Sequence, residues 1–186
     1  MGGGAIGIII GCILLAGVLY VISTYNGLIR MKNKIEEALA TVEAYLKKRY
    51  DLIPNLVETV KGYAKHEKQT FTDVIEARNK VMTAVGFDEM SRSENTLKDT
   101  LKSLFALAEN YPELKANQNF LDLQTQLTKV EDDILQSRKY YNGVVKTYNT
   151  KTETFPNSMV ATAFKFEKRE YYKIDEEAKQ NVKVSF

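Results

Sequence analysis

The chain opens with a long apolar run, and apolar side chains then recur at helical spacing among charged ones. Residues 1–29 contain no charged side chain, and Gly2 to Ser23 have the sequence GGGAIGIIIGCILLAGVLYVIS. At ~1.5 Å per residue, a helix of this length covers the ~30 Å hydrocarbon core of a bilayer. The pattern therefore predicts a transmembrane anchor over residues 1–27.

A cleaved secretory signal would differ from this run in three ways. It would need a basic segment at its start, a shorter apolar core and a small-residue cleavage site. No Lys or Arg precedes the run, which continues past Cys12 and ends among the bulky residues Tyr20 and Val21. We therefore expect a retained anchor. Cys12 is the only cysteine, so no intramolecular disulfide can form.

Flanking charge predicts the orientation of the anchor. Arg30, Lys32 and Lys34 follow the span closely, and no basic residue precedes it. Basic residues accumulate on the cytoplasmic side of a membrane helix. We expect the N-terminus outside and the remaining, charged body of the chain in the cytoplasm.

Three glycines share one face of the predicted anchor. Gly3, Gly7 and Gly11 are spaced by four residues, which places them on the same side of a helix. Small residues at this spacing let two membrane helices approach closely, which indicates an oligomer face. Glycine is also common in membrane helices that form no interface, so both interpretations stay open.

The body shows four apolar stripes with a spacing of three and four residues, the signature of amphipathic helices. The first begins at Leu28, and no proline interrupts residues 5 to 53, so the anchor is expected to continue into it with Gly27 as a soft point. Pro54 permits a bend or restart before a second stripe over residues 55–85.

Turn and capping signals separate the later helices. Gly86 begins a break, and Ser91 to Glu94 form a capping-box pattern that predicts the start of a third helix. Tyr111-Pro112 interrupts it before a fourth. Short breaks between long helices favour antiparallel neighbours. We predict an all-α fold, with a transmembrane helix, an antiparallel up-and-down four-helix bundle over residues 28–155, and a tail over residues 156–186.

The tail is aromatic and charged. It contains Phe164, Phe166 and Tyr171 with Lys165, Lys168 and Arg169, and Phe155 directly precedes it. In an up-and-down bundle the fourth helix ends where the first begins, beside the membrane. The tail is therefore expected to pack near the base of the bundle or on the lipid surface.

The sequence contains no recognisable catalytic, metal-binding or cofactor-binding pattern. A di-metal site in a bundle needs two Glu-x-x-His pairs, and His66 is the only histidine. It lies in a charged segment, where an exposed or helix-capping role is expected. There is no glycine-rich phosphate loop. We predict a protein that is not an enzyme and has no cofactor.

Some charged residues fall in register with the apolar stripes. They are Arg49, Glu67, Arg78, Glu131 and Arg138. A buried ion costs several kcal/mol unless it is paired, so these residues could form a buried network that fixes helix register. Alternatively, they lie at the rim of the bundle, where ion pairs contribute ~0–1 kcal/mol.

Several motifs resemble those of the LemA family. They are Tyr25-Asn26, Lys48-Arg49-Tyr50-Asp51-Leu52-Ile53-Pro54-Asn55-Leu56-Val57, Tyr63-Ala64-Lys65-His66-Glu67, Ala77-Arg78, Tyr111-Pro112-Glu113-Leu114-Lys115-Ala116-Asn117, Arg138-Lys139-Tyr140-Tyr141-Asn142 and Phe155-Pro156. The resemblance runs from about residue 20 to the C-terminus. It implies a bacterial single-pass membrane protein with a helical bundle and no established biochemical activity. It also suggests a membrane protease as a partner, since such proteases are often encoded beside family members.

These observations favour a membrane-anchored scaffold or adaptor that self-associates in the bacterial cell membrane. Its expected partners are membrane lipid, further copies of the chain and a membrane protein. The alternative is a ligand- or stress-sensing module that binds a small molecule or peptide between helices, which requires a pocket with convergent polar groups. Nucleic-acid binding is disfavoured, because the net charge is only +2 and acidic residues alternate with basic ones.

Overall fold

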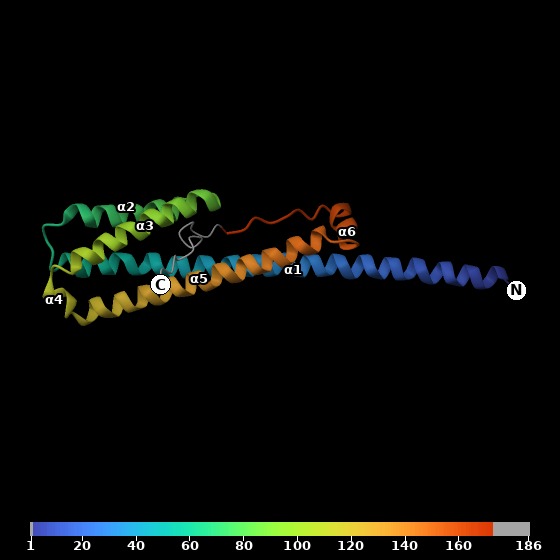
Figure 1. Cartoon of the computed structure of the whole chain (residues 1–186), viewed down its shortest axis with the longest axis horizontal. Coiled ribbons are helices and arrows are strands. Elements are labelled where there is room, and N and C mark those ends of the chain that lie inside the picture. Colours follow the sequence, from blue (N-terminus) through green and yellow to red (C-terminus); the bar gives the residue numbers. More distant parts are fainter. Residues whose placement is uncertain (1, 173–186) are drawn as a thin grey trace, which may run out of the picture. The chain divides into compact units, whose positions relative to one another are not determined.

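The computed structural model describes residues 2–172, and within them every regular element is an α-helix (Figure 1). This confirms the predicted all-α class. The helices are α1 (Gly2–Lys61), α2 (Lys68–Thr83), α3 (Gly86–Ala108), α4 (Pro112–Lys115), α5 (Gln118–Glu153) and α6 (Asn157–Ala163).

The described residues divide into two compact units. Unit 1 comprises residues 2–40 and 139–171, and unit 2 comprises residues 41–138 with residue 172. The division falls within the two long helices, α1 and α5, so each unit holds part of both. The boundaries expected from the sequence at residues 27/28 and 155/156 stay a prediction, and residues 173–186 of the expected tail lie outside the described residues.

Unit 2 is the bundle. It combines the C-terminal part of α1, α2, α3, α4 and the N-terminal part of α5. Helices α2 and α3 lie side by side (Figure 1). The core is formed by the apolar stripes, with buried side chains that include Val42, Leu46, Ile53, Leu56, Val60, Phe71, Val74, Leu97, Leu101, Leu104, Leu127, Val130 and Ile134. Burial of one such side chain contributes about 1.5–3 kcal/mol, so the stripes dominate the stability of this unit.

Helix α1 does not restart at Pro54, where the sequence permits a bend or restart. It runs without a break from Gly2 to Lys61, through both Gly27 and Pro54. The connection to the next helix comes later, at residues 62–67, so the second helix begins at Lys68. Proline inside a helix removes one backbone hydrogen bond, and a side chain of α2 compensates for it.

Helix α3 also begins earlier than expected. It starts at Gly86, whose φ of 81° lies in the left-handed region that suits glycine. The carboxylate of Glu89 accepts a hydrogen bond from the backbone N–H of Val85 at 3.0 Å. Ser91 to Glu94 are therefore inside the helix, and the capping-box interpretation of these four residues is wrong.

Unit 1 contains the apolar helix. Helix α1 is long and apolar enough to cross a membrane. Its most apolar 18-residue window has a mean hydropathy of 2.8, and none of that window is buried. Further along, Leu28, Ile35 and Ala38 of α1 are buried, and so are Val145 and Tyr148 of α5 in the same unit. This part of α1 therefore packs on the protein, whereas the preceding part exposes its apolar side chains.

After α5, the chain forms a hairpin and returns. Helix α6 is followed by residues 165–172, which have no regular structure. Tyr148 donates a hydrogen bond from its hydroxyl to the carbonyl oxygen of Glu167 at 3.0 Å, and Asn149 exchanges two with the backbone of Arg169, both 2.9 Å long. Side chains of α5 thus hold residues 166–170 along that helix. We call this segment the return strap.

Candidate functional site

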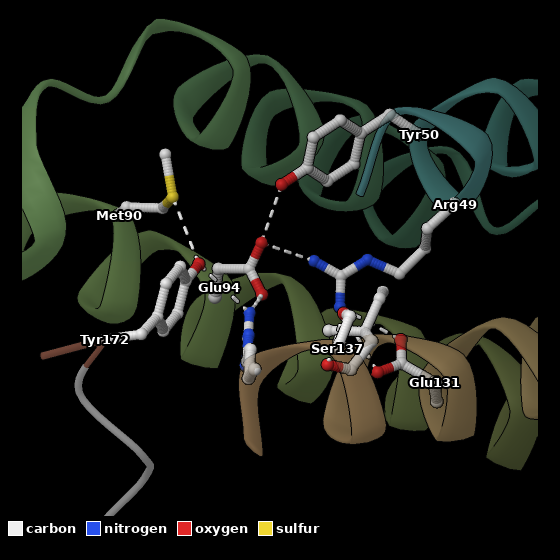
Figure 2. A network of polar contacts seen from close by, with 9 residues as sticks. Arg49, Tyr50, Met90, Glu94, Glu131, Ser137 and Tyr172 are labelled. Carbon is white, nitrogen blue, oxygen red and sulfur yellow. Dashed lines mark hydrogen bonds and ion pairs between the residues drawn. The ribbon is translucent and has the colours of Figure 1, made fainter. Parts of the chain in front are cut away.

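Four charged side chains meet in the core of unit 2, and we call them the charge cluster: Arg49 of α1, Glu94 of α3, and Glu131 and Arg138 of α5 (Figure 2). Glu94 lies at the centre. One carboxylate oxygen accepts from Arg49 Nη2 at 2.6 Å, and the other accepts from Arg138 Nη2 at 2.5 Å. Arg49 also donates to Glu131 at 2.9 Å. The cluster therefore ties three helices together.

Three uncharged side chains enclose the cluster. Tyr50 donates to the Glu94 oxygen that Arg49 also contacts, at 2.6 Å. Tyr172 lies against Arg138, with the guanidinium carbon 4.5 Å from the ring centroid, and its hydroxyl is 3.1 Å from the sulfur of Met90 (Figure 2). An arginine over an aromatic face gains a cation–π interaction. These contacts complete a closed site.

Burial differs sharply across the cluster. Arg49 and Glu94 are 3% and 6% exposed, whereas the side chain of Glu131 is 50% exposed. Arg49 and Glu94 thus form the buried core, and Glu131 connects it to the surface.

Opposite charge outweighs desolvation at the centre. Burial by itself raises the pKa of Glu94, but Arg49 and Arg138, together with the hydrogen bond from Tyr50, bring it below its ordinary value. Burial lowers the pKa of Arg49, and Glu94 and Glu131 more than reverse this effect. Burial and the negative charge of Glu94 raise the pKa of Tyr50. At neutral pH Arg49 and Glu94 are therefore both charged, and Tyr50 is neutral.

The arrangement suits a structural role. Both oxygens of Glu94 are occupied by donors, while Nε of Arg49 and Nε of Arg138 have no hydrogen-bond partner within residues 2–172. A general base would need an accessible, less strongly paired carboxylate. Ion pairs that join three helices instead discriminate between helix registers, because any slip would leave a buried charge unpaired.

Arg78 has a separate partner. Its Nε donates to the backbone carbonyl oxygen of Tyr50 at 2.8 Å. That carbonyl lies four residues before Pro54, which has no N–H to donate to it. Arg78 of α2 therefore replaces the hydrogen bond that proline removes, and this contact explains how α1 continues through Pro54.

Of the five charged residues that the sequence places in register with the apolar stripes, Glu67 does not lie on a helical stripe. It occupies the N-cap position of α2, with no side-chain capping hydrogen bond, and is half-buried. The sequence register placed it on a helix that continues from residue 55, but the chain turns at residues 62–67 instead. The structure thus brings Arg49, Glu131 and Arg138 together, connects Arg78 to the neighbouring backbone and leaves Glu67 at the helix end.

Glu94, the central acid, was missed in the sequence because the capping-box pattern offered another role for it. A usable signal was present: Glu94 precedes Leu97, Leu101 and Leu104 at spacings of three, four and three, so it lies on the apolar stripe of α3. Tyr172 carried no such signal, since its contact with Arg138 joins residues 34 positions apart.

The glycine face lies within α1. An added Cβ at Gly7 or Gly11 would meet no atom within 4 Å, and Gly3 precedes them in the same helix. The lone cysteine, Cys12, is exposed in this segment. Across residues 2–172, no group of three His, Cys, Asp or Glu side chains is placed to hold a metal ion.

The apolar helix and the ion-paired bundle define a membrane-associated, all-helical class of protein. Comparison with protein families is more specific, because the LemA family model matches residues 38–186. The chain belongs to the LemA family.

Individual relatives agree with this assignment. Over 155 residues the chain is 28% identical to Protein LemA of Metamycoplasma hominis, covering 80% of this chain and 69% of that protein. It is 23% identical over 174 residues to the magnetosome proteins MamQ 1 and MamQ 2 of Paramagnetospirillum magneticum, covering 80% of this chain. The chain spans 64% of the length of each of these two proteins. None of these names denotes an enzymatic activity.

Proposed function

We propose that this protein is a non-enzymatic, single-pass membrane scaffold or adaptor that self-associates through its anchor and presents the helical bundle to a protein partner. The observation that carries the proposal is the open glycine face of α1. Gly7 and Gly11 have no neighbour within 4 Å of an added Cβ, and nearby apolar side chains such as Ile8 and Leu14 are 70% and 65% exposed. Small residues on an apolar helix favour close packing with a second helix in lipid.

The charge cluster supports the same conclusion. Its charged groups are ion-paired with one another, and Arg49 and Glu94 at its centre are buried, so it suits a structural role better than a reactive one. Two of the relatives are named as magnetosome proteins. A role in membrane organisation fits a chain that joins an anchor to a bundle of fixed register.

We further infer that the N-terminus lies outside and the bundle in the cytoplasm. Arg30, Lys32 and Lys34 follow the apolar span of α1 directly, and basic residues favour the cytoplasmic side. Protease added to intact spheroplasts should leave the bundle uncut, whereas protease added to inverted vesicles should digest it. The reverse pattern would refute this orientation.

Self-association is tested by filling the glycine face. Replacing Gly3, Gly7 and Gly11 together with Leu keeps the span apolar but blocks close approach of two backbones. Full-length protein in mild detergent should change from an oligomer to a smaller species, measured by light scattering and by crosslinking in native membranes.

The matched control uses Ala5→Leu with Ala16→Leu. At 100° per residue, these positions lie about 160–180° around the helix from Gly7, and both are exposed. The control should keep the wild-type oligomer. If the wild-type protein is monomeric in detergent and forms no crosslinks in membranes, the scaffold proposal fails and the sensor alternative gains support.

A further inference from the structure

A basic cleft in unit 1 lies directly beyond the apolar part of α1. It has a volume of about 350 Å³, within the range of roughly 300–1,000 Å³ that is usual for ligand sites. Tyr25, Ile29 and Lys32 of α1 form one wall, and residues 164–169 form the other. Four basic side chains line it against one acidic side chain: Lys32, Lys165, Lys168, Arg169 and Glu167.

The α1 wall of the cleft follows the apolar span of that helix closely. Ile22 is the last large apolar side chain of the span and is 51% exposed. Tyr25 and Ile29 follow it by three and seven residues, which corresponds to roughly 5 and 10 Å along the helix. The headgroup layer occupies about 5–8 Å beyond the hydrocarbon. A span whose hydrocarbon part ends near Ile22 would place Tyr25 at the inner edge of the headgroup layer and Ile29 just beyond its outer edge, so this layer would meet the α1 wall of the cleft.

Exposed apolar side chains lie on the hairpin that leads into one wall of the cleft. Phe155, Met159 and Phe164 are 80%, 65% and 51% exposed, and they precede, belong to and follow helix α6. The hairpin that carries them is attached beside the end of the span. Tyr20 donates to the side-chain oxygen of Asn157 at 2.8 Å, and the ring of Tyr25 packs edge-on against that of Phe164 at 4.9 Å. Apolar residues in this position insert into the boundary between headgroups and acyl chains.

The basic wall is held in place by its main chain. In the return strap, the backbone of Glu167 is hydrogen-bonded to the side chain of Tyr148, and the backbone of Arg169 to the side chain of Asn149. Lys165 occupies the left-handed region with φ 57°, after a helix end where the N–H of Phe166 bonds to the carbonyl of Ala161 at 2.9 Å. Glycine is the residue that best fits such a helix end. Lys165 therefore has a less favourable backbone conformation than glycine would have, and it adds a positive charge to the lining of the cleft.

We propose that this cleft binds the phosphate headgroup of an anionic phospholipid in the leaflet next to the bundle, with Lys165 and Arg169 as its main contacts. Lys168 is ion-paired with Glu153 and contributes to the headgroup site by exchanging that carboxylate for the phosphate. The aromatic hairpin contacts the acyl region, and the basic side chains neutralise the headgroup charge. The inference goes beyond the proposed scaffold, since it needs only the anchor and unit 1.

The test uses the full chain reconstituted in phosphatidylcholine vesicles that contain a trace of spin-labelled lipid. Electron spin resonance measures the motionally restricted fraction of labelled phosphatidylglycerol relative to labelled phosphatidylcholine. We expect wild-type protein to prefer phosphatidylglycerol by about fivefold, the attraction of roughly one basic group to an anionic surface. The triple variant K165Q/K168Q/R169Q should lose this preference.

A matched control separates the cleft from general charge. K80Q/K115Q/K129Q removes three exposed lysines from unit 2, changes the net charge by the same amount and should keep the preference. Lys165→Gly removes one amine and suits the left-handed backbone, so it should reduce the preference without unfolding the hairpin, as judged by circular dichroism.

Three results would overturn the proposal. In the first, wild-type protein restricts the two labelled lipids equally. In the second, the control variant loses the preference for phosphatidylglycerol as much as the triple variant does. In the third, the triple variant keeps the full preference. A free phosphate source is distinguished by adding glycerol 3-phosphate at millimolar concentration. Displacement of the spin-labelled lipid by this competitor would assign the cleft to a soluble anion instead of a membrane lipid.

Discussion

Units 1 and 2 use different chemistry to hold their polar groups. In unit 2, the buried polar core consists of ions, with Arg49 and Glu94 at its centre. In unit 1, neutral side chains of α5 bind main-chain groups of the return strap, as Tyr148 and Asn149 do. The first arrangement joins helices to one another, and the second attaches an irregular segment to one helix.

The difference has consequences for stability. A buried ion pair contributes little relative to an apolar substitute, but removal of one partner leaves a buried charge that is costly. A neutral hydrogen bond contributes about 0.5–1.5 kcal/mol, and its loss is moderate when water can replace it. Unit 2 should therefore respond steeply to mutation and to pH, whereas unit 1 should respond weakly and locally.

The largest effect is expected from Glu94→Gln. This change leaves Arg49 and Arg138 facing a neutral amide in a buried site, and it should cost about 3–5 kcal/mol of the free energy of unfolding. Urea denaturation of the full chain in mild detergent, followed by circular dichroism, measures it. Glu131→Gln is the control, and because Glu131 is half-exposed it should cost no more than ~1 kcal/mol. Equal small losses in both variants would show that Glu94 is not the centre of the cluster.

Acid should weaken unit 2 through the same carboxylate. Because the pKa of Glu94 is lower in the folded protein than its ordinary value, its ionised form stabilises the fold above about pH 4.3, the unfolded value. That contribution is lost as the pH falls through the folded pKa. The free energy of unfolding should decline more steeply below about pH 4.3 in the wild type than in Glu94→Gln. Parallel pH profiles would contradict the linkage.

A smaller effect is expected at the junction of α1 and α2. Arg78→Ala leaves the Tyr50 carbonyl without the donor that replaces the N–H missing at Pro54, and it should cost about 1–3 kcal/mol. Adding Pro54→Ala restores an N–H four residues after Tyr50 and should recover much of the loss. The double-mutant cycle measures the coupling between the two positions. Strictly additive effects would mean that Arg78 does not compensate for the proline.

The fold could be predicted from the sequence more readily than the ion-pair and hydrogen-bond partners of the charged side chains. Apolar spacing was sufficient for the all-α class, because period and helix length are local properties. Register with the apolar stripes also identified Arg49, Glu131 and Arg138, which lie on continuous helical stripes. It failed at Glu67 because the turn at residues 62–67 depends on a distant contact: Arg78 allows α1 to pass Pro54 and moves the break downstream. Glu94 was obscured by a local capping pattern, and the role of Tyr172 depends on the path of the strap.

The smallest effect is expected in the return strap. Asn149→Ala removes both side-chain hydrogen bonds to Arg169, which should cost about 1 kcal/mol. Since the contact holds an irregular segment to one helix, the loss should appear as local opening. Hydrogen exchange of the Arg169 amide should accelerate about fivefold, the equivalent of ~1 kcal/mol, while core amides such as that of Leu97 keep their rates. The control is Tyr140→Phe, because Tyr140 is 52% exposed. Acceleration throughout unit 2 would show that the strap supports the bundle as a whole, and the contrast between the two units would then no longer hold.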